Sequence, residues 1–324
     1  KQSGIKIEPE RTGIVMGTAM AGIATIAYTQ EALTGASHKK VGPRFIPKIL
    51  GNIAAANIAI DYNIQGPSFT VSTACSSGGD AINTACMCMQ SGKADIMLAV
   101  GAESVLCPLV IYSLANAKAL SRRNDSPSTA SRPFDVTRDG FVIGEGGGAL
   151  VLETEEHALA RGAKIYAEIR GCGNTDDAYH VTAPHPEGRG AIACMKQAIA
   201  EAGINPSDIG YINAHGTATN KGDTVETSSI KKVFGNTLPY VSSTKGATGH
   251  MMGAGGITET ITCVKAIETG TVPPTINLNE VDPECAGIDF VANIAKKAEI
   301  NFAMSNAFGF GGQNSSIIVG KYGK

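Results

Sequence analysis

Charged side chains are scarce in this sequence. They make up 17% of its 324 residues, below the quarter that is typical of globular domains. The shortage favours a chain that buries much of its surface, part of it in an oligomer interface. Acidic and basic residues nearly cancel, leaving a net charge of −2, so no overall field attracts nucleic acid.

Long apolar runs and metal-binding patterns are also missing. No hydrophobic stretch approaches the roughly 20 residues of a membrane-spanning helix, so we expect no membrane contact. The eight cysteines form no CxxC pair, and no group of cysteines and histidines has zinc spacing. A chain of this length needs no disulfides to build a core, and no secretory signal is recognisable at its start. We therefore expect a reducing compartment, the cytoplasm.

Apolar runs with strand character alternate with alanine-rich or amphipathic segments along the chain. Strands are predicted at 12–17, 68–71, 94–101, 149–153, 165–170, 209–214, 240–243, 289–291, 302–306 and 315–319, and helices at 24–33, 45–60, 155–161, 191–202, 223–233 and 255–268. The glycine run 144–148 predicts a turn before strand 149–153. Such alternation predicts an α/β fold with a mainly parallel core, whose active residues come from loops at strand ends.

Cys75 lies where the predicted strand 68–71 turns into a helix of small residues. Unpaired N–H groups and the dipole at a helix start favour negative charge. A thiol placed there would have a lowered pKa and act as a nucleophile, and Gly78 and Gly79 would leave room for a substrate. A free cysteine is usually a buried structural residue, so Cys75 alone does not decide between the two roles.

Two histidines occupy similar positions later in the sequence. His215 follows the predicted strand 209–214, and His250 lies in the loop after strand 240–243, five residues beyond Lys245. A single loop histidine is more often structural than catalytic. Two of them in small-residue loops after buried strands, with a lysine close by, indicate a catalytic centre.

These loops belong to a longer series of motifs. The series comprises Thr73-Ala74-Cys75-Ser76-Ser77, Arg132-Pro133-Phe134-Asp135, Gly144-Glu145-Gly146, Asp177-Ala178-Tyr179-His180, His215-Gly216-Thr217-Ala218-Thr219, Gly222-Asp223, Lys245 with Thr248-Gly249-His250, Pro273-Pro274-Thr275-Ile276-Asn277 and Asn306-Ala307-Phe308-Gly309-Phe310-Gly311-Gly312. In order and spacing it resembles the β-ketoacyl synthases, the condensing enzymes of fatty acid and polyketide synthesis. Within that family it is most similar to the 3-oxoacyl-[acyl-carrier-protein] synthase II type.

The resemblance implies a thiolase-like α/β fold of two repeated halves, each a five-stranded mixed sheet layered with helices. The first half would span residues 1–155 and the second 156–324. The family's opening strand and following helices are not matched, so we expect a truncated chain or one whose early residues are missing. Leu114 stands where many type II enzymes have a pocket phenylalanine, which bears on acyl-chain preference, and Ala307 replaces a more frequent serine.

The activity that the resemblance implies is decarboxylative Claisen condensation in fatty acid biosynthesis. Cys75 would accept an acyl group from acyl carrier protein, while its own N–H and that of Phe310 hold the oxyanion. His215 and His250 would then hydrogen-bond the malonyl thioester carbonyl and stabilise the enolate left by loss of carbon dioxide. No cofactor and no metal are implied, because the departing carboxylate supplies the driving force.

The same resemblance gives supporting roles to further polar residues. Lys245 and Glu226 would form a charged network that orients the two histidines. Thr217 and Thr219 would contact the pantetheine arm of the substrate, and Thr182 would line the same malonyl pocket.

The remaining implied roles concern access to the site and partners. Phe308 and Phe310 lie in a glycine-rich loop, where glycine permits backbone movement, and Phe310 resembles a gate that opens when the acyl-cysteine forms. Lys39, Lys40 and Lys118 fall where the family binds the acidic carrier protein. A homodimer through the region following the Cys75 helix is expected as well.

Three other functions remain as alternatives. A thiolase would use a second cysteine as its base instead of the Cys-His-His set. A non-catalytic chain-length partner in a heterodimer would lack the nucleophile, which is present here. A Cys–His hydrolase would need a water-accessible acyl-enzyme, which a narrow apolar tunnel disfavours. Chain-length preference and the choice between fatty acid and polyketide pathways stay open, and an organelle matrix becomes the expected location if the missing start carried a transit peptide.

Overall fold

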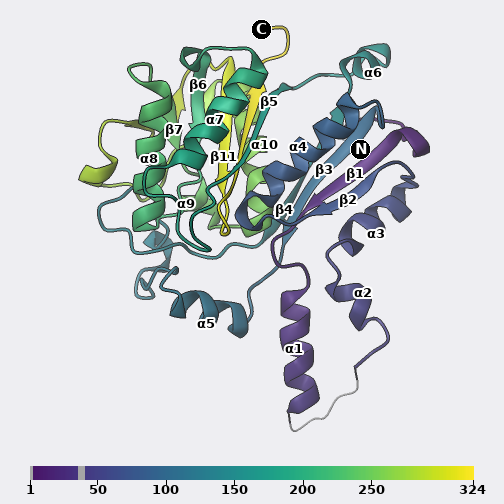
Figure 1. The fold of residues 1–324 in the computed structure, drawn as a ribbon, viewed down its shortest axis with the longest axis horizontal. Coiled ribbons are helices and arrows are strands. Elements are labelled where there is room, and N and C mark those ends of the chain that lie inside the picture. Colours follow the sequence, from purple (N-terminus) through teal and green to yellow (C-terminus); the bar gives the residue numbers. More distant parts are fainter. Residues whose placement is uncertain (1–2, 36–40) are drawn as a thin grey trace.

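A computed structural model describes residues 3–35 and 41–324 of the chain (Figure 1). Strands from the first half of the sequence form one sheet and strands from the second half form another. The two sheets lie on either side of a shared helical layer, and further helices cover their outer faces. The predicted α/β class, with mixed sheets and layered helices, is confirmed.

The first sheet has the strand order β2-β1-β3-β4 among the described residues. Strand β1 pairs in parallel with both β2 and β3, and β4 runs antiparallel to β3. This half consists of β1 (Thr12–Gly17), α1 (Ile23–Thr34), α2 (Phe45–Ile49), α3 (Ile53–Tyr62), β2 (Ser68–Val71), α4 (Ser77–Gln90), β3 (Ile96–Glu103), α5 (Pro108–Asn116) and β4 (Gly146–Glu153).

The second sheet has the order β5-β12-β11-β6-β7-β9 within the described ranges. Its antiparallel members are β5, β12 and β11, while β11, β6, β7 and β9 run parallel. This half consists of α6 (Glu155–Ala160), β5 (Glu168–Asp176), α7 (Arg189–Ala202), β6 (Ile209–Asn213), α8 (Asn220–Phe234), β7 (Tyr240–Ser242), α9 (Lys245–Thr248), α10 (Gly255–Thr269), β8 (Thr271–Val272), β9 (Asp289–Phe290), β10 (Lys296–Lys297), β11 (Phe302–Phe308) and β12 (Gln313–Gly320). Strands β8 and β10 form a separate antiparallel pair.

Helices α4 and α10 form the shared layer between the two sheets. Helix α4 packs on β1 and β3 and also on β12, and α10 packs on β11 and also on β4. One apolar cluster therefore includes Val15 and Ile82 from the first half together with Ile257 and Ile317 from the second. The division at residue 155 stays an interpretation of the topology, because both halves contribute to this one core. Among the described residues, no helix combines the length and apolar character needed to cross a membrane.

The strand count per sheet differs from the expected five. The described part of the first sheet has four strands and the second sheet has six. In the second sheet β5 pairs with the outer edge of β12, and the two-residue strand β9 adds to β7. In the first sheet β4 pairs with β3 on one edge only, since no described strand lies against the other.

Two local predictions need adjustment. The segment 45–60, predicted to be mostly helical, is two helices, α2 and α3, separated at 50–52 around Gly51, a residue type that weakens helices. The predicted glycine turn at 144–148 instead contributes the first three residues of β4. A Cβ at Gly148 would lie 3.0 Å from Ile257 of α10, so the glycines allow this helix to approach the sheet closely.

Candidate active site

The turn that carries Cys75 connects β2 to α4. Residues 74–76 form a single 3-10 turn, and α4 begins at Ser77. Ala74 has a φ of 52°, in the left-handed region that few residues other than glycine adopt. The Cys75 side chain is buried in an apolar cluster that also contains Leu114 and Phe141. Leu114, predicted to influence acyl-chain preference, therefore lies in the same cluster as the nucleophile.

Gly78 and Gly79 serve packing instead of substrate access. A Cβ at Gly78 would lie 2.8 Å from the Gly253 oxygen, and one at Gly79 would lie 2.4 Å from the Ser315 hydroxyl. Both contacts are too short for a side chain. The expected room for a substrate at these glycines is therefore wrong: they let α4 approach α10 and β12.

His250 lies directly beside the nucleophile, with its Nε2 atom 3.0 Å from Cys75 Sγ. Burial raises the pKa of the Cys75 thiol to about 11, although the positive charge of Lys245 and a hydrogen bond from the Phe310 N–H act in the opposite direction. The prediction that the helix start lowers the pKa of the Cys75 thiol is therefore wrong. Because desolvation of the sulfur outweighs the stabilising charges, the thiol needs an acceptor for its proton, and His250 is in position to be one.

The two histidines face each other edge to face. Their ring centroids are 5.4 Å apart, with an angle of 87° between the ring planes. Burial and the Lys245 charge hold the pKa of each histidine well below its usual range, and the neighbouring His250 lowers that of His215 further. Both imidazoles are therefore neutral at pH 7, and each has one N–H to donate and one nitrogen that can accept.

Glu226 holds the loop of His215. Its two carboxylate oxygens accept the backbone N–H groups of His215 and Gly216, at 2.8 Å each. Burial raises the pKa of Glu226 to about 7, against the effect of these two hydrogen bonds. This geometry fixes where β6 delivers the His215 ring.

The hydrogen-bond partner of Lys245 is Glu259 of α10, not Glu226 as expected. The Lys245 ammonium donates to the Glu259 carboxylate, and both side chains are buried. Glu226 contacts the loop backbone instead, although the Lys245 charge still lowers its pKa. The predicted network is therefore corrected to Lys245 and Glu259, with Glu226 as an anchor of the adjacent loop.

The loop after β11 reaches the nucleophile from the second half. The Phe310 N–H is directed at the Cys75 sulfur, and Phe310 is 39% exposed. The Phe308 ring lies 5.8 Å from that of His215. Gly311 and Gly312 have φ values of 94° and 92°, which only glycine adopts readily. Both phenylalanines thus border the site, and the gating movement of Phe310 stays a prediction.

The predicted threonines lie around the same loops. The hydroxyls of Thr217 and Thr219 are 3.0 Å apart. Thr182 is exposed, and its neighbour Val181 accepts a 2.7 Å hydrogen bond from the Gly311 N–H. The structure therefore brings the segment of Thr182 against the glycine-rich loop. The contact of Thr182, Thr217 and Thr219 with a substrate stays a prediction.

Comparison with known proteins identifies the family. Residues 1–158 match the β-ketoacyl synthase N-terminal domain, and residues 166–279 match the β-ketoacyl synthase C-terminal domain. The chain belongs to the β-ketoacyl synthase family. Its curated relatives include the 3-oxoacyl-[acyl-carrier-protein] synthase 2 of Rhizobium meliloti, 45% identical over 96% of this chain and 74% of that protein. The mitochondrial 3-oxoacyl-[acyl-carrier-protein] synthase of Arabidopsis thaliana is 44% identical over 96% of this chain and 68% of that protein.

Solved structures of ketosynthases have the same fold. A type II PKS ketosynthase in complex with its acyl-carrier protein superimposes with a TM-score of 0.93 at 34% identity, covering 99% of this chain and 81% of that one. A β-ketoacyl synthase from Burkholderia phymatum gives a TM-score of 0.89 at 35% identity, over 96% of this chain and 75% of that one. The predicted family and thiolase-like fold class of this β-ketoacyl synthase are confirmed.

One of the three lysines predicted to dock the carrier protein lies within the described residues. Lys118 is exposed just beyond the end of α5, whereas Lys39 and Lys40 lie outside the described residues. Within the described part of the chain, no group of three or more histidine, cysteine or acidic side chains is placed to hold a metal ion.

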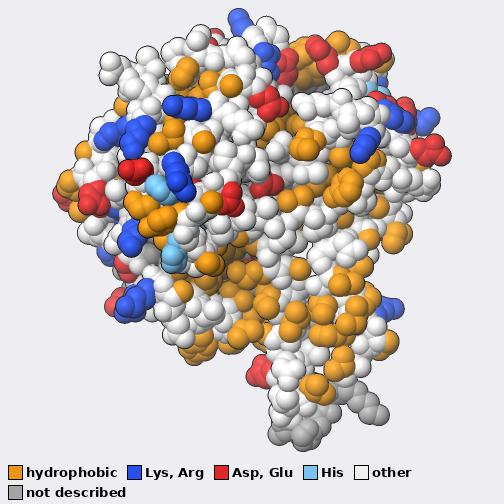
Figure 2. All heavy atoms as spheres, viewed as in Figure 1, with side chains coloured by type: hydrophobic (Ala, Val, Ile, Leu, Met, Phe, Trp, Pro, Cys, Tyr) orange, Lys and Arg blue, Asp and Glu red, His pale blue; other side chains and the backbone are white. Residues whose placement is uncertain are grey.

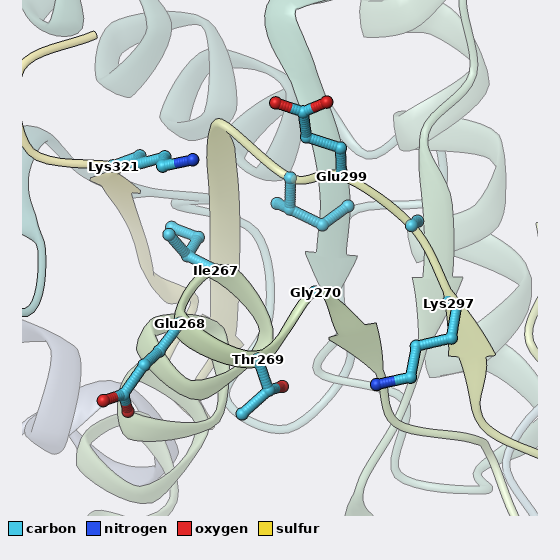
Figure 3. Close-up of a pocket in the computed structure, with 9 residues that line it drawn as sticks. Ile267, Glu268, Thr269, Gly270, Lys297, Glu299 and Lys321 are labelled. Carbon is cyan, nitrogen blue, oxygen red and sulfur yellow. The ribbon is translucent and has the colours of Figure 1, made fainter.

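A surface hollow of about 570 Å³ lies at the far end of α10 (Figure 3). Its lining includes Glu268, Lys297, Glu299 and Lys321 but neither cysteine nor histidine. Helix α10 begins against the Cys75 turn and rises about 1.5 Å per residue. The hollow is therefore roughly 20 Å from the nucleophile, and we assign it no role in the chemistry.

Sequence reasoning missed two residues that shape the site. Glu259 pairs with Lys245, and the signal for it is a single acid in an otherwise uncharged stretch, nine residues after His250. Phe141 packs edge-on against the His250 ring, with the ring centroids 5.3 Å apart, and the carbonyl oxygen of Val142 accepts the backbone N–H of His250 at 2.7 Å. No sequence pattern connects Phe141 to His250, because the contact spans more than a hundred residues.

Proposed function

We propose that this protein elongates a fatty acyl chain by two carbons, condensing an acyl group on Cys75 with malonyl-acyl carrier protein as carbon dioxide is lost. The observation that carries the proposal is the meeting of four groups. Cys75 Sγ lies 3.0 Å from His250 Nε2, the His215 ring stands against that of His250, and the Phe310 N–H points at the sulfur. Membership of the β-ketoacyl synthase family supports it.

The first step transfers the acyl group to the enzyme. His250 Nε2 accepts the thiol proton, and the Cys75 sulfur attacks the carbonyl carbon of the acyl thioester. The developing oxyanion accepts hydrogen bonds from the N–H groups of Cys75 and Phe310. The carbon–sulfur bond to the carrier then breaks, and the proton passes from His250 to the departing carrier thiol, which leaves His250 neutral.

The second step forms the carbon–carbon bond. Neutral His215 and His250 donate hydrogen bonds to the malonyl thioester carbonyl as the carboxylate leaves as carbon dioxide. The resulting enolate carbon attacks the acyl carbon on Cys75, the bond to Sγ breaks, and the released thiolate takes up a proton from solvent. A neutral imidazole can carry its hydrogen on either nitrogen, so His250 can accept in the first step and donate in the second.

Intact-protein mass spectrometry tests the whole sequence. Incubation with acyl-carrier protein should add the mass of one acyl group. Addition of malonyl-carrier protein should remove that mass and yield a carrier-bound 3-oxoacyl product. Release of the acyl group as a free acid before malonyl-carrier is added would favour the hydrolase alternative and contradict the proposal.

A homodimer is part of the proposal. Exposed apolar side chains gather over α1, α2 and α5 (Figure 2), among them Tyr28, Leu33, Ile46, Leu109 and Tyr112. Contiguous apolar surface of this kind commonly marks a protein interface. Helix α5 lies in the region that follows the Cys75 helix in sequence, and this is the region expected to join the subunits. A monomer by light scattering at micromolar concentration would contradict the dimer.

Carrier docking and location complete the proposal. We assign the acidic acyl carrier protein to the face that presents Lys118. Lys39 and Lys40, which lie outside the described residues, are assigned to the same partner on the family resemblance. The ketosynthase cited above was solved with its own acyl-carrier protein, which supports a carrier as partner. We place the enzyme in the cytoplasm or in an organelle matrix, and one relative is named as a mitochondrial enzyme.

A further inference from the structure

The turn at Cys75 is held in a conformation that its sequence does not favour. Ala74 adopts a φ of 52°, which places its Cβ close to neighbouring backbone. Strain of this kind persists only where the surroundings hold it. The contacts on either side of Ala74 and Cys75 therefore decide where the sulfur lies.

Asp80, one turn into α4, makes those contacts. It is 4% exposed. Its Oδ2 atom accepts hydrogen bonds from the Thr73 hydroxyl at 2.5 Å and from the Ser76 hydroxyl at 2.9 Å. Its Oδ1 atom accepts the Asn174 side-chain amide at 2.6 Å. Thr73 and Ser76 bracket Ala74 and Cys75, and Asn174 lies on β5 in the opposite sheet.

One carboxylate thus joins the nucleophile turn to the half of the molecule that carries the histidines. The charged groups that act on the Cys75 thiol are Lys245, Glu103 and Glu259. Asp80 reaches the thiol through two hydroxyls instead of through its own charge. The histidine that faces the thiol is His250.

We propose that Asp80 is a positioning residue, which through Thr73, Ser76 and Asn174 holds Cys75 Sγ within hydrogen-bond distance of His250 Nε2. This inference rests on the proposed function in so far as Cys75 is the nucleophile. It adds a residue that touches neither the reacting atoms nor the substrate.

The first measurement is the rate of Cys75 alkylation by iodoacetamide between pH 6 and 9, which requires no assumption about substrate. Asp80→Ala should lower the rate at pH 7 about tenfold and displace the profile to higher pH, because the thiol loses its proton acceptor. Asp80→Asn, whose amide oxygen can still accept hydrogen bonds, should recover part of the rate. If Asp80 acted only through its negative charge, its removal would make the Cys75 thiol easier to deprotonate and would displace the profile to lower pH. That result would overturn the proposal.

The second measurement separates positioning from folding. Decarboxylation of malonyl-carrier by Cys75→Gln should be the same with and without Asp80→Ala, because the two histidines belong to the other half. Asp135→Ala is the matched control: Asp135 is 2% exposed and accepts the N–H groups of Asn279 and Glu280. It should lower the melting temperature and leave the alkylation profile unchanged.

If Asp80→Ala fails to fold, Thr73→Val and Ser76→Ala each remove one hydroxyl from the cluster. Each should then lower the alkylation rate at pH 7 two- to fivefold in a folded protein. An unchanged rate in both variants would contradict the role of Asp80. Absence of acyl transfer by the unsubstituted protein, together with an alkylation profile that Asp80→Ala still displaces, would instead count against the proposed function and leave the positioning role standing.

Discussion

The two halves of the molecule share a strand–helix arrangement but contribute different chemistry. The first half supplies the sulfur of Cys75, on a turn between β2 and α4. The second supplies His215 shortly after β6, Lys245 at the start of α9, His250 just beyond that helix, and the Phe310 N–H after β11. The nucleophile and the groups that act on it are thus on separate sheets, and the shared layer of α4 and α10 sets the distance between them.

The halves also differ in how their antiparallel strands are covered. Strand β12 pairs on both edges and is almost fully buried, whereas β4 pairs on one edge and alternates between partly and well exposed residues. Among the described residues, β12 is therefore the better-covered strand, and truncating its side chains should cost more stability than truncating those of β4.

Replacing Cys75 should give the largest difference between acyl transfer, which depends on the first half, and decarboxylation, which depends on the second. Cys75→Ser should reduce acyl transfer by about 10⁴-fold or more, as removal of a catalytic nucleophile does in other enzymes. Cys75→Gln should keep or raise decarboxylation, because an amide resembles the acyl-enzyme and the histidines are untouched. Single-turnover acylation by mass spectrometry and carbon dioxide release measure the two steps. An active Cys75→Ser enzyme in which iodoacetamide labels another cysteine first would refute the assignment.

Replacing either histidine should act mainly on decarboxylation of the malonyl group, the step that Cys75→Gln leaves intact. His215→Ala and His250→Ala should each lower carbon dioxide release about 10²–10³-fold, the usual loss for one oxyanion donor. His250→Ala should also slow acylation of Cys75, because His250 is the group 3.0 Å from the sulfur, and His215→Ala should slow it less. Both steps are measured on the same enzyme preparations. Unimpaired decarboxylation in both variants would refute the assigned mechanism.

The positive charge of Lys245 acts on groups from both halves. It lowers the pKa of both histidines, and it opposes the burial that raises the pKa of the Cys75 thiol. Lys245→Met should raise the histidine pKa values, so the acid limb of the acylation profile should move to higher pH as His250 becomes protonated and cannot accept the thiol proton. It should also destabilise the fold by about 3–5 kcal/mol, because Glu259 is left buried without its partner.

The control for that prediction is the double variant Lys245→Met/Glu259→Gln. It should recover much of the stability while keeping the displaced pH profile, measured by chemical denaturation and by single-turnover acylation from pH 5 to 8. An acid limb that does not move in either variant would show that Lys245 does not set the protonation of His250.

The smallest effect should distinguish the two antiparallel strands. Val319 of β12 is fully buried and Val151 of β4 is 39% exposed. Val319→Ala should lower the free energy of unfolding by about 2 kcal/mol, from lost burial and the cavity left behind. Val151→Ala should cost less than about 0.5 kcal/mol, as surface substitutions do. Equal losses in urea titrations would mean that β4 is covered in solution, for example by a partner.

Much of the fold was predictable because it depends on local pattern. The strands at β1, β3 and β6 and the helices at α1 and α7 follow from apolar periodicity, to within a few residues. The glycine run at the start of β4 was misread, since a glycine that permits close helix packing and one that forms a turn look alike in sequence. The split between α2 and α3 was missed because a single glycine is a weak signal.

The site shows the same division between local and long-range information. The sequence by itself determined which groups are present, because Cys75, His215, Lys245 and His250 each occupy a recognisable loop at the end of a strand. Only the tertiary structure decided that Lys245 pairs with Glu259, that Glu226 holds a loop, and that the pKa of Cys75 rises. Ion pairing and desolvation depend on which distant segments enclose a group, and that enclosure exists only once α4, α10 and the two sheets have packed together.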